Sequence, residues 1–409
     1  MSNSTASKAG SPNRARSDRP AGALPLPALL ALATAVFVTS LTETLPAGVL
    51  PAMSADLGVG EAAMGQAVTV YAIGTALTAI PLTAATAGWR RKRLLLTAVA
   101  GFAVANTVTA LSAHYALTMA ARFLAGVAAG VAWALLAGYA RRMVPVHLQG
   151  RAIAVVMTGI PLALALGVPA GTFLGAAVGW RVTFLVMTAL AAVLLAWIVL
   201  TVPDFPGLPR GGRVPVRRTL AVPGVTPVLS MTLVLVLAHT ILYTYVAAFL
   251  DHLGMGGSTG PVLLAFGGAS LLSLWFTGLH IDRRLRALTL GGTVLFAVAS
   301  GTLAAATDSA ALVYAAATLW GLGWGGAPTL LQTAVGDAGG EAADTAQTML
   351  VSVWNAAMAG GGVVGGLLLD LLGAAALPWS VLLLLVPVLT VVAAARTHGF
   401  PVRRGPSGA

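Results

Sequence analysis

The chain has 409 residues, of which 58% are hydrophobic and only 9% are charged, and its mean hydropathy is +0.90. Soluble domains carry roughly 25% charged residues, so this composition excludes a water-soluble fold, and it excludes a disordered chain because disorder needs low hydrophobicity. The absence of cysteine excludes disulfides, thiolate metal sites and thiol catalysis. The six histidines and twelve acidic residues offer little from which to build a metal centre or a catalytic site. We therefore expect an integral membrane protein without a metal centre, a cofactor or catalytic residues.

Apolar stretches long enough to cross a bilayer recur along the chain. A helix crosses about 30 Å of hydrocarbon in about 20 residues. Residues 1–23 are rich in Ser and Arg and are expected to form a disordered tail, and the apolar stretch that follows is too long for a signal peptide. The sequence predicts an all-α membrane protein with twelve transmembrane helices, at 25–50, 62–86, 94–112, 116–140, 152–178, 182–202, 226–250, 260–280, 287–306, 310–334, 344–369 and 377–395.

The basic residues indicate the orientation. Of the 23 Lys and Arg residues, 21 lie in the two tails and in the loops on the same side of the membrane, and the other two are Arg122 and Arg181. Loops rich in Lys and Arg stay on the cytoplasmic side, so both termini are expected to be cytoplasmic. The excess of Arg over Lys indicates a GC-rich bacterial genome and therefore a bacterial plasma membrane. Topology and contact with the lipid bilayer account for the basic clusters, so nucleic acid is not an expected partner.

The second half of the chain repeats the organisation of the first. The basic loop at 88–93 has a counterpart at 282–286, 194 positions later, and Gly126 and Gly130 have counterparts in Gly321 and Gly325 at an offset of 195. We therefore expect two pseudo-symmetric six-helix bundles related by an axis along the membrane normal, as in transporters with parallel repeats. The expected organisation is a cytoplasmic tail at 1–23, bundles at 24–202 and 226–395, a cytoplasmic linker at 203–225 and a cytoplasmic tail at 396–409.

Glycines spaced by four residues mark the fifth and the eleventh predicted helices. Gly167, Gly171 and Gly175 share one face of the fifth, and Gly361 and Gly365 share one face of the eleventh. Glycine on a helix face lets two backbones approach closely inside a membrane. Static packing explains any single stripe, but the recurrence in both halves favours an interface that moves.

Four motifs carry a family resemblance. They are Thr42-Glu43-Thr44 followed by Gly48-Val49-Leu50-Pro51; Arg122 with Gly126 and Gly130; Gly167-Val168-Pro169-Ala170-Gly171; and Gly278 followed by Asp282 and Arg283. Over about residues 25–395 the chain resembles the major facilitator superfamily, in particular the drug:proton antiporter branch that includes arabinose-efflux and chloramphenicol-resistance permeases. The resemblance implies the twelve-helix major facilitator fold, and it implies that Gly167, Pro169, Gly171, Gly278, Asp282 and Arg283 serve the conformational change.

The first-half copy of the loop motif departs from the family pattern. Ala84 stands where the family has glycine, and Gly88 stands where it has aspartate, although the basic run at 90–93 is retained. In the family this loop helps to hold one conformation through its acidic residue. Either the first-half latch is weaker here, or the second-half copy with Asp282 alone contributes.

Two charged residues lie well inside predicted helices. At 1.5 Å per residue, Glu43 lies about 10 Å and Arg122 about 9 Å from the outer ends of their helices, so we expect both to face one central cavity. An ionisable group in hydrocarbon is costly and is by default a functional candidate. Burial disfavours the carboxylate and Arg122 favours it, so a change of conformation would make Glu43 bind and release a proton. The alternative is a fixed structural ion pair.

Other polar and aromatic side chains are expected to line the same cavity and to contact substrate. These are Tyr71, Asn106, Trp133, His239, Tyr243, Gln332, Trp354 and Asn355. Aromatic residues with one polar edge suit an amphipathic organic molecule. Each could equally be a packing residue. Asp337, Glu341 and Asp344 form an acidic loop on the cytoplasmic side, for which we favour solvation over pairing with the Arg-rich loops.

These observations predict a monomeric secondary active transporter, and the resemblance supplies the direction of transport. It implies proton-coupled efflux of a small organic molecule, either a drug such as chloramphenicol or a sugar-like metabolite, by alternating access. No phosphate-binding glycine loop of the Gly-x-x-x-x-Gly-Lys type occurs, so ATP is not the expected energy source. An importer or uniporter for a sugar or metabolite is the alternative, and a non-transporting membrane sensor is a second one. No set of side chains supports an enzyme.

Overall fold

The structure is a computed structural model that describes residues 24–207, 214–305 and 309–394. Within these ranges every regular element is helical, and ten continuous helical stretches are long and apolar enough to cross a membrane. Two of the ten, Gly256–Ala305 with 50 residues and Ala310–Leu372 with 63 residues, exceed one crossing. A helix of 50 residues would extend about 75 Å, against about 30 Å of hydrocarbon. Each of these stretches contains two spans, which gives the twelve that the sequence predicts.

The turn between the eighth and ninth spans lies inside α13 (Thr259–Ala305). Arg284 has non-helical dihedral angles, φ −131° and ψ 28°. Trp320 packs against Phe266 and Phe296 on the two sides of this turn, with ring centroids 4.6 and 6.0 Å away. In a straight helix these two phenylalanines would lie about 45 Å apart, so one tryptophan could not touch both. α13 therefore folds back on itself near Arg284.

The first half of the chain forms six spans around two buried apolar clusters, a large one that runs from Ala28 to Val202 and a smaller one that includes Met53 and Phe184. The fifth span is interrupted by a short π-helical turn, Ala163–Gly167. The helices are α1 (Leu26–Gly48), α2 (Leu50–Leu57), α3 (Glu61–Ala85), α4 (Arg91–Leu111), α5 (Tyr115–Arg142), α6 (Gln149–Met157), α7 (Gly159–Leu162), α8 (Val168–Val178) and α9 (Trp180–Thr201).

The second half has its own apolar cluster, from Val225 to Val392, and a short helix in the linker, α10 (Val216–Leu220), that the sequence did not predict. The remaining helices are α11 (Val225–Thr244), α12 (Val246–His252), α13, α14 (Ala310–Trp324), α15 (Ala327–Gly339), α16 (Ala343–Leu372) and α17 (Ala376–Ala394). The predicted tails at 1–23 and 396–409, Arg210 and Arg213 of the linker, and Asp308 lie outside the described residues.

The duplication extends to individual hydrogen bonds. The hydroxyl of Thr75 on α3 donates to the carbonyl of Gly126 on α5 over 3.0 Å, and the hydroxyl of Ser270 donates to the carbonyl of Gly321 over 3.2 Å. Both members of the second pair lie 195 positions after their counterparts. In each of these places the glycine carries no side chain to hold the neighbouring helix away, so the backbones meet.

The first and seventh spans also bend at equivalent places. α1 gives way to α2 at Val49, with φ −121° and ψ 14°, and α11 gives way to α12 at Tyr245, with φ −109° and ψ 17°. The two residues are 196 positions apart. This register makes it possible to pair residues of the two halves by counting back from each bend.

The glycine stripes lie inside each half. A Cβ atom on Gly167 or Gly175 would crowd Leu41 or Val49 of α1, within 3.1 and 2.6 Å, and one on Gly361 would lie 2.6 Å from Thr240 of α11. The fifth span thus packs on the first as the eleventh packs on the seventh. Gly278 differs, because it faces Ala154 of the other half at 3.0 Å. A role for these residues in motion stays a prediction.

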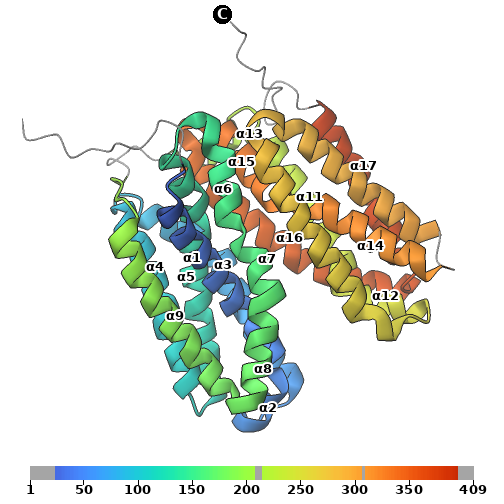
Figure 1. The fold of residues 1–409 in the computed structure, drawn as a ribbon, viewed down its shortest axis with the longest axis horizontal. Helices are drawn as coiled ribbons and strands as arrows, with labels where there is room; N and C mark the ends of the chain where they lie inside the picture. The colour runs from blue at the N-terminus through green and yellow to red at the C-terminus, as the bar shows by residue number, and fades with distance from the viewer. Residues whose placement is uncertain (1–23, 208–213, 306–308, 395–409) are drawn as a thin grey trace, which may run out of the picture.

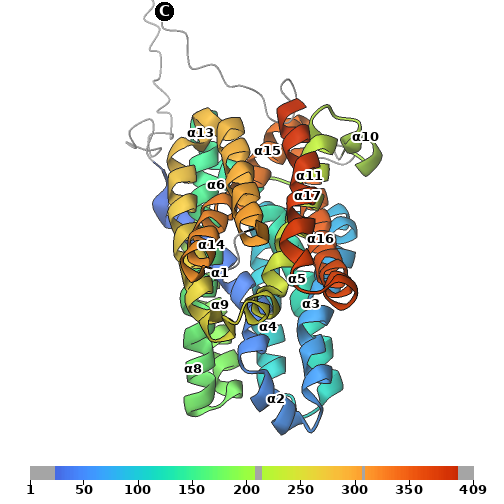
Figure 2. The same ribbon diagram turned by 90° about the vertical axis from the view of Figure 1, so that its right-hand side faces the viewer.

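The two halves lie side by side, meet at one end and diverge toward the other, where α2 and α12 lie (Figure 1). We call the end where they meet the arginine-rich end; it carries the loops around Arg91, Arg142, Arg151 and Arg283. The linker helix α10 lies at this end as well (Figure 2), where the hydroxyl of Thr345 donates to the carbonyl of Val214 over 3.1 Å.

Candidate functional site

Glu43 lies on α1, six residues before the bend at Val49. Pro46, between them, lacks the N–H that would continue the helical ladder, which weakens the helix locally. The helical path resumes in α2 and ends at Leu57, so Glu43 is fourteen residues, or about 21 Å, from that end. The sequence-based depth of about 10 Å, which ends the span near residue 50, stays a prediction. Glu43 is partly buried.

Arg122 on α5 is fully buried, with 0% of its surface exposed. Its Nε donates to the carbonyl of Ala67 over 3.3 Å, and its Nη2 donates to the carbonyl of Glu43 over 3.4 Å. The guanidinium carbon lies 5.0 Å from the centre of the Tyr71 ring. Nη1 is buried and has no hydrogen-bond partner among the described residues. A permanent positive charge is therefore held by carbonyl dipoles and a ring face, with the two N–H donors of Nη1 left over.

The structure brings Glu43 and Arg122 together through the main chain of Glu43. In the described part of the chain, no ion pair within 4.0 Å joins the two side chains. The guanidinium charge of Arg122 acts on the Glu43 carboxyl group, but no ion pair joins the two groups. This arrangement differs from the fixed ion pair that is the alternative to proton coupling.

Tyr71 and Asn106 hold α1 in place beside this pair. The hydroxyl of Tyr71 donates to the carbonyl of Thr39 over 3.2 Å, and Nδ2 of Asn106 donates to the hydroxyl of Thr42 over 3.3 Å. Both side chains are almost completely buried. The structure therefore places these two predicted substrate contacts between helices and not on an open surface. Oδ1 of Asn106 is a second buried atom for which the described residues supply no partner.

His239 on α11 sits among aromatic rings of the second half. Nε1 of Trp320 donates to its Nδ1 over 3.2 Å, and the Trp324 ring stacks on it with centroids 3.6 Å apart. Tyr243, one turn along the same helix, lies 5.2 Å from it, and Trp354 of α16 lies 5.8 Å beyond Trp324. Three of the predicted cavity residues, His239, Tyr243 and Trp354, thus belong to one cluster.

The other predicted cavity residues are separate from that cluster. Gln332 on α15 crosses to the first half, where its Nε2 contacts Sδ of Met157 at 3.2 Å. Asn355 donates to the carbonyl of Val351 in its own helix over 2.9 Å, and Trp133 packs against the apolar cluster of the first half. Gln332 therefore serves contact between the halves.

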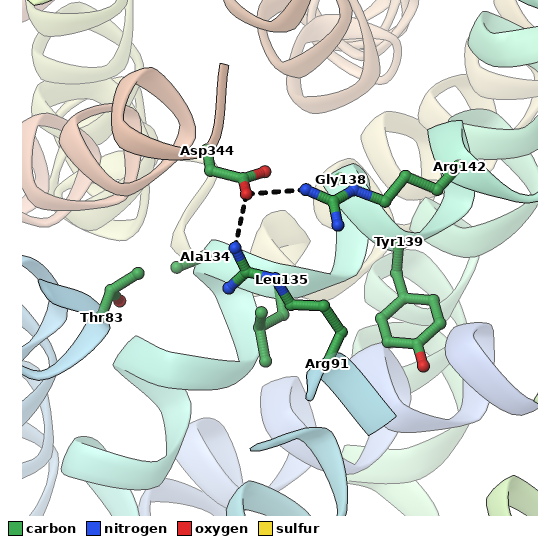
Figure 3. A pocket seen from close by; sticks show the side chains of 8 residues that line it. All are labelled: Thr83, Arg91, Ala134, Leu135, Gly138, Tyr139, Arg142 and Asp344. Atoms are coloured by element: carbon green, nitrogen blue, oxygen red, sulfur yellow. Dashed lines mark hydrogen bonds and ion pairs between the residues drawn. The ribbon is translucent and has the colours of Figure 1, made fainter. Parts of the chain in front are cut away.

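Asp344 closes the arginine-rich end. Its Oδ2 accepts from Nη2 of Arg91 over 2.6 Å and from Nη2 of Arg142 over 2.8 Å. Both arginines belong to the first half and Asp344 begins α16 of the second, so one carboxylate joins the two halves (Figure 3). Arg91 is almost fully buried, with 4% of its side chain exposed.

Two further pairs cross at this end. Asp337 accepts from Nη1 of Arg141 over 2.8 Å. Asp282 accepts from the backbone N–H groups of Gly150 and Arg151, over 2.6 and 3.3 Å, at the start of α6. Sequence analysis favoured solvation for Asp337 and Asp344, and that expectation was wrong. The sequence does show acidic and basic loops on the same side of the membrane. Whether these loops touch depends on the tertiary structure, and the sequence does not give that.

The first-half loop also contacts the other half, but through a basic residue and not through an acidic one. In the second half an acidic residue, Asp282, meets the first turn of a helix in the other half. In the first half, where Gly88 replaces the acidic residue, the basic Arg91 meets an acidic residue in the first turn of α16. Both copies of the loop therefore make contacts between the halves.

Neighbouring groups of that loop bind the end of α9. Arg90 pairs with Asp204, which also accepts from the backbone N–H of Lys92 over 3.2 Å. Burial raises the pKa of the Asp204 carboxyl, but the bonds from Arg90 and Lys92 outweigh it and hold that pKa below the ordinary 3.8. The basic loop is thereby anchored within its own half.

Comparison with known proteins agrees with this architecture. A family model described as the Major Facilitator Superfamily matches residues 32–350. The chain belongs to the major facilitator superfamily. It is 32% identical over 359 residues to a chloramphenicol efflux pump of Mycobacterium tuberculosis (strain CDC 1551 / Oshkosh). The aligned region covers 84% of this chain and 86% of that protein. It is 28% identical over 352 residues to a purine ribonucleoside efflux pump of Salmonella paratyphi C (strain RKS4594), with 85% and 88% covered.

A solved structure supports the fold of this superfamily member. A proton:xylose symporter bound to 6-bromo-6-deoxy-D-glucose superposes with a TM-score of 0.72, covering 91% of this chain and 95% of that one, at 13% sequence identity. Similarity at this identity concerns the fold alone. The family and the two efflux pumps are transporters, so this chain is a multi-pass membrane transporter of small molecules and not an enzyme.

Proposed function

We propose that this transporter is a proton-coupled exporter that works as a monomer in the bacterial plasma membrane, with both termini in the cytoplasm. Its substrate is a small organic molecule of the drug or metabolite kind. The observation that carries the proposal is the contact of Glu43 with the fully buried Arg122, whose Nη2 donates to the Glu43 carbonyl and whose Nη1 has no partner among the described residues.

The position of Arg122 gives Glu43 two distinct states. When the carboxyl is charged, the guanidinium 3.4 Å from the Glu43 carbonyl offsets part of its charge. When the carboxyl takes up a proton, the arginine charge is left to carbonyl dipoles and the Tyr71 ring. A buried positive charge without a counter-charge is costly, so protonation changes the preferred arrangement of α1 against α5. That change in preference is what coupling to a proton gradient requires.

The bend at Val49 supplies a means for α1 to respond. The outer segment α2 is joined to α1 through a residue with non-helical dihedral angles, three residues after Pro46. Helix segments divided near mid-membrane are the usual site-forming elements of secondary transporters. Glu43 lies one and a half turns before this joint, so a shift of its side chain and a shift of α2 are mechanically connected.

The closed arginine-rich end supports the assignment of a transport state. Asp344, Asp337 and Asp282 join the halves there, whereas the halves diverge at the α2 end (Figure 1). With the Arg-rich loops in the cytoplasm, this is the outward-facing state. Release of these ion pairs opens the cytoplasmic side, and their formation closes it after substrate has entered. The two relatives named as efflux pumps support export as the direction.

The test is Glu43→Gln in the full-length protein reconstituted into liposomes, with an imposed pH gradient and chloramphenicol or inosine as the transported probe. Uphill transport should fall to the background of empty liposomes, while exchange of the probe without a gradient continues. The matched control is Asp370→Asn, which removes an exposed carboxyl group near the end of α16 and should leave uphill transport unchanged. Gradient-driven accumulation that survives Glu43→Gln at the wild-type rate would refute the coupling role.

A further inference from the structure

Four aromatic rings of the second half form a continuous series of ring contacts across three helices. Tyr243 and His239 lie on α11, Trp324 ends α14, and Trp354 lies on α16. Successive ring centroids are 5.2, 3.6 and 5.8 Å apart, and the His239 and Trp324 planes differ by only 7°. We call these four residues the ring stack.

The ring stack occupies the place that the charged pair occupies in the first half. His239 lies six residues before the bend at Tyr245, as Glu43 lies six residues before the bend at Val49. Phe266, 5.9 Å from His239, lies 195 positions after Tyr71 of the Arg122 site. The two sites are therefore related by the internal duplication and lie at equivalent depth.

Part of the ring stack is open. Tyr243 is 39% exposed, and His239, Trp324 and Trp354 are half-buried, whereas Trp320 behind them is 1% exposed. Trp354 is ten residues from Asp344 along α16, or about 15 Å from the closed arginine-rich end. Trp354 therefore lies well away from the closed arginine-rich end, in the middle third of α16.

The hydrogen bond from Trp320 fixes the chemistry of His239. An indole nitrogen only donates, so Nδ1 of His239 accepts and carries no proton. The imidazole is then the neutral form with its proton on Nε2, on the far side of the ring from Trp320. The ring stack therefore offers apolar ring surface and one N–H donor from a neutral ring.

The charge of the surroundings narrows the class of ligand. The stretches 225–250, 259–281, 287–305, 310–336 and 345–369 contain no Lys, Arg, Asp or Glu. A charged ligand would therefore find no counter-ion among these helices. A cation is attracted by ring faces, but it finds no carboxylate among these helices.

We infer that the ring stack binds the planar ring of an uncharged aromatic or heteroaromatic substrate, with Nε2–H of His239 donating to an acceptor atom of that ring system or its substituents. This inference rests on the proposed function as an exporter and adds the substrate class and a division of labour. The first half carries the proton chemistry at Glu43, and the second half recognises the ring. Stacking on Trp324 and its neighbours supplies part of the affinity.

The test is equilibrium binding to the purified full-length protein in lipid nanodiscs. Chloramphenicol serves as a neutral aromatic probe with acceptor atoms, xylose as a neutral non-aromatic probe and ethidium as a planar cation. Trp324→Leu should weaken chloramphenicol binding about tenfold, because it removes the central ring of the stack. Trp379→Leu, on the exposed face of α17 with 54% of the tryptophan accessible, is the matched control and should bind like the wild type.

His239→Phe is a second variant that keeps a ring in the stack and removes the donor. It should also weaken chloramphenicol binding by roughly tenfold while the protein stays monodisperse. The inference is overturned if the wild type binds xylose or ethidium as tightly as chloramphenicol, or if Trp324→Leu and His239→Phe both bind chloramphenicol like Trp379→Leu.

The same preparations separate this inference from the proposed function. If Glu43→Gln abolishes uphill transport but the ring-stack variants bind normally, the exporter stands and the recognition site is elsewhere. If the ring-stack variants lose binding but Glu43→Gln still accumulates the probe on a proton gradient, the recognition site stands and the coupling residue is wrong.

Discussion

The Asp344→Asn substitution removes the acceptor that Arg91 and Arg142 share at 2.6 and 2.8 Å across the two halves. Breaking a buried pair costs about 3–5 kcal/mol, and an exposed pair is worth about 0–1 kcal/mol. Arg91 is 4% exposed, but Asp344 is 26% and Arg142 33% exposed, so the cost lies between these limits. We take about 2–3 kcal/mol, which lowers the ratio of closed to open forms at the arginine-rich end by roughly 30- to 150-fold.

The chain contains no cysteine, so a single introduced thiol reports on this opening without background. Thr83 lines the small pocket around Arg91 and Asp344 and is 7% exposed, and Thr83→Cys is nearly isosteric. In the Asp344→Asn background, the thiol should react with a membrane-impermeant maleimide at least tenfold faster than with Asp344 intact, when the reagent is applied to the arginine-rich side.

The matched control for this prediction lies at the opposite end. Asp56 pairs with Arg181 over 2.8 Å within the first half, and Asp56→Asn should leave the labelling of Thr83→Cys unchanged. The reasoning fails if Asp344→Asn leaves the labelling rate unaltered in a protein that inserts and stays monodisperse. It also fails if Asp56→Asn accelerates labelling equally, because the effect would then be general loosening.

Two further predictions concern the charged site and the helix contacts. Arg122→Lys keeps the positive charge but loses the two guanidinium contacts to the carbonyls of Ala67 and Glu43. Gradient-driven transport in liposomes should therefore fall at least tenfold while the protein still folds. Transport at the wild-type rate would show that only the charge matters. Gly126→Ala places a Cβ against the Tyr71 carbonyl and should destabilise the protein by about 1–3 kcal/mol, measured as a lower midpoint of thermal unfolding in detergent. Gly362→Ala, with open space around the glycine, should leave the midpoint unchanged. Equal midpoints for the two variants would contradict the close contact at Gly126.

The duplication was legible in the sequence because it is a one-dimensional property. Offsets of 194 and 195 between basic loops and glycines predict two similar halves, and the Thr75–Gly126 and Ser270–Gly321 hydrogen bonds follow the same offset. The equivalence of Glu43 and His239 needs an offset of 196, which this counting did not give. It was missed because the register of the first and seventh spans depends on bends at Val49 and Tyr245 that no spacing of apolar residues reveals.

The candidate site was less predictable. The sequence pointed to Glu43 and Arg122 because charge in hydrocarbon is costly, but the contact runs through the Glu43 carbonyl, which composition cannot show. Tyr71 and Asn106 were expected at a cavity and instead bond to α1, since a polar side chain inside a bundle takes the nearest acceptor. The closure by Arg91, Arg142 and Asp344 depends on which end of the molecule is shut.

Taken alone, the sequence determined that this chain crosses a membrane, how often it does so and that its halves are copies. Hydropathy acts on each segment separately, and repetition is preserved in the order of residues. Only the tertiary structure decided which surfaces meet, because helices in a bilayer gain little from burying apolar faces and associate through close packing and hydrogen bonds between segments far apart in the chain. The pairing of Asp344 with two distant arginines and the ring stack around His239 are products of that second kind of interaction.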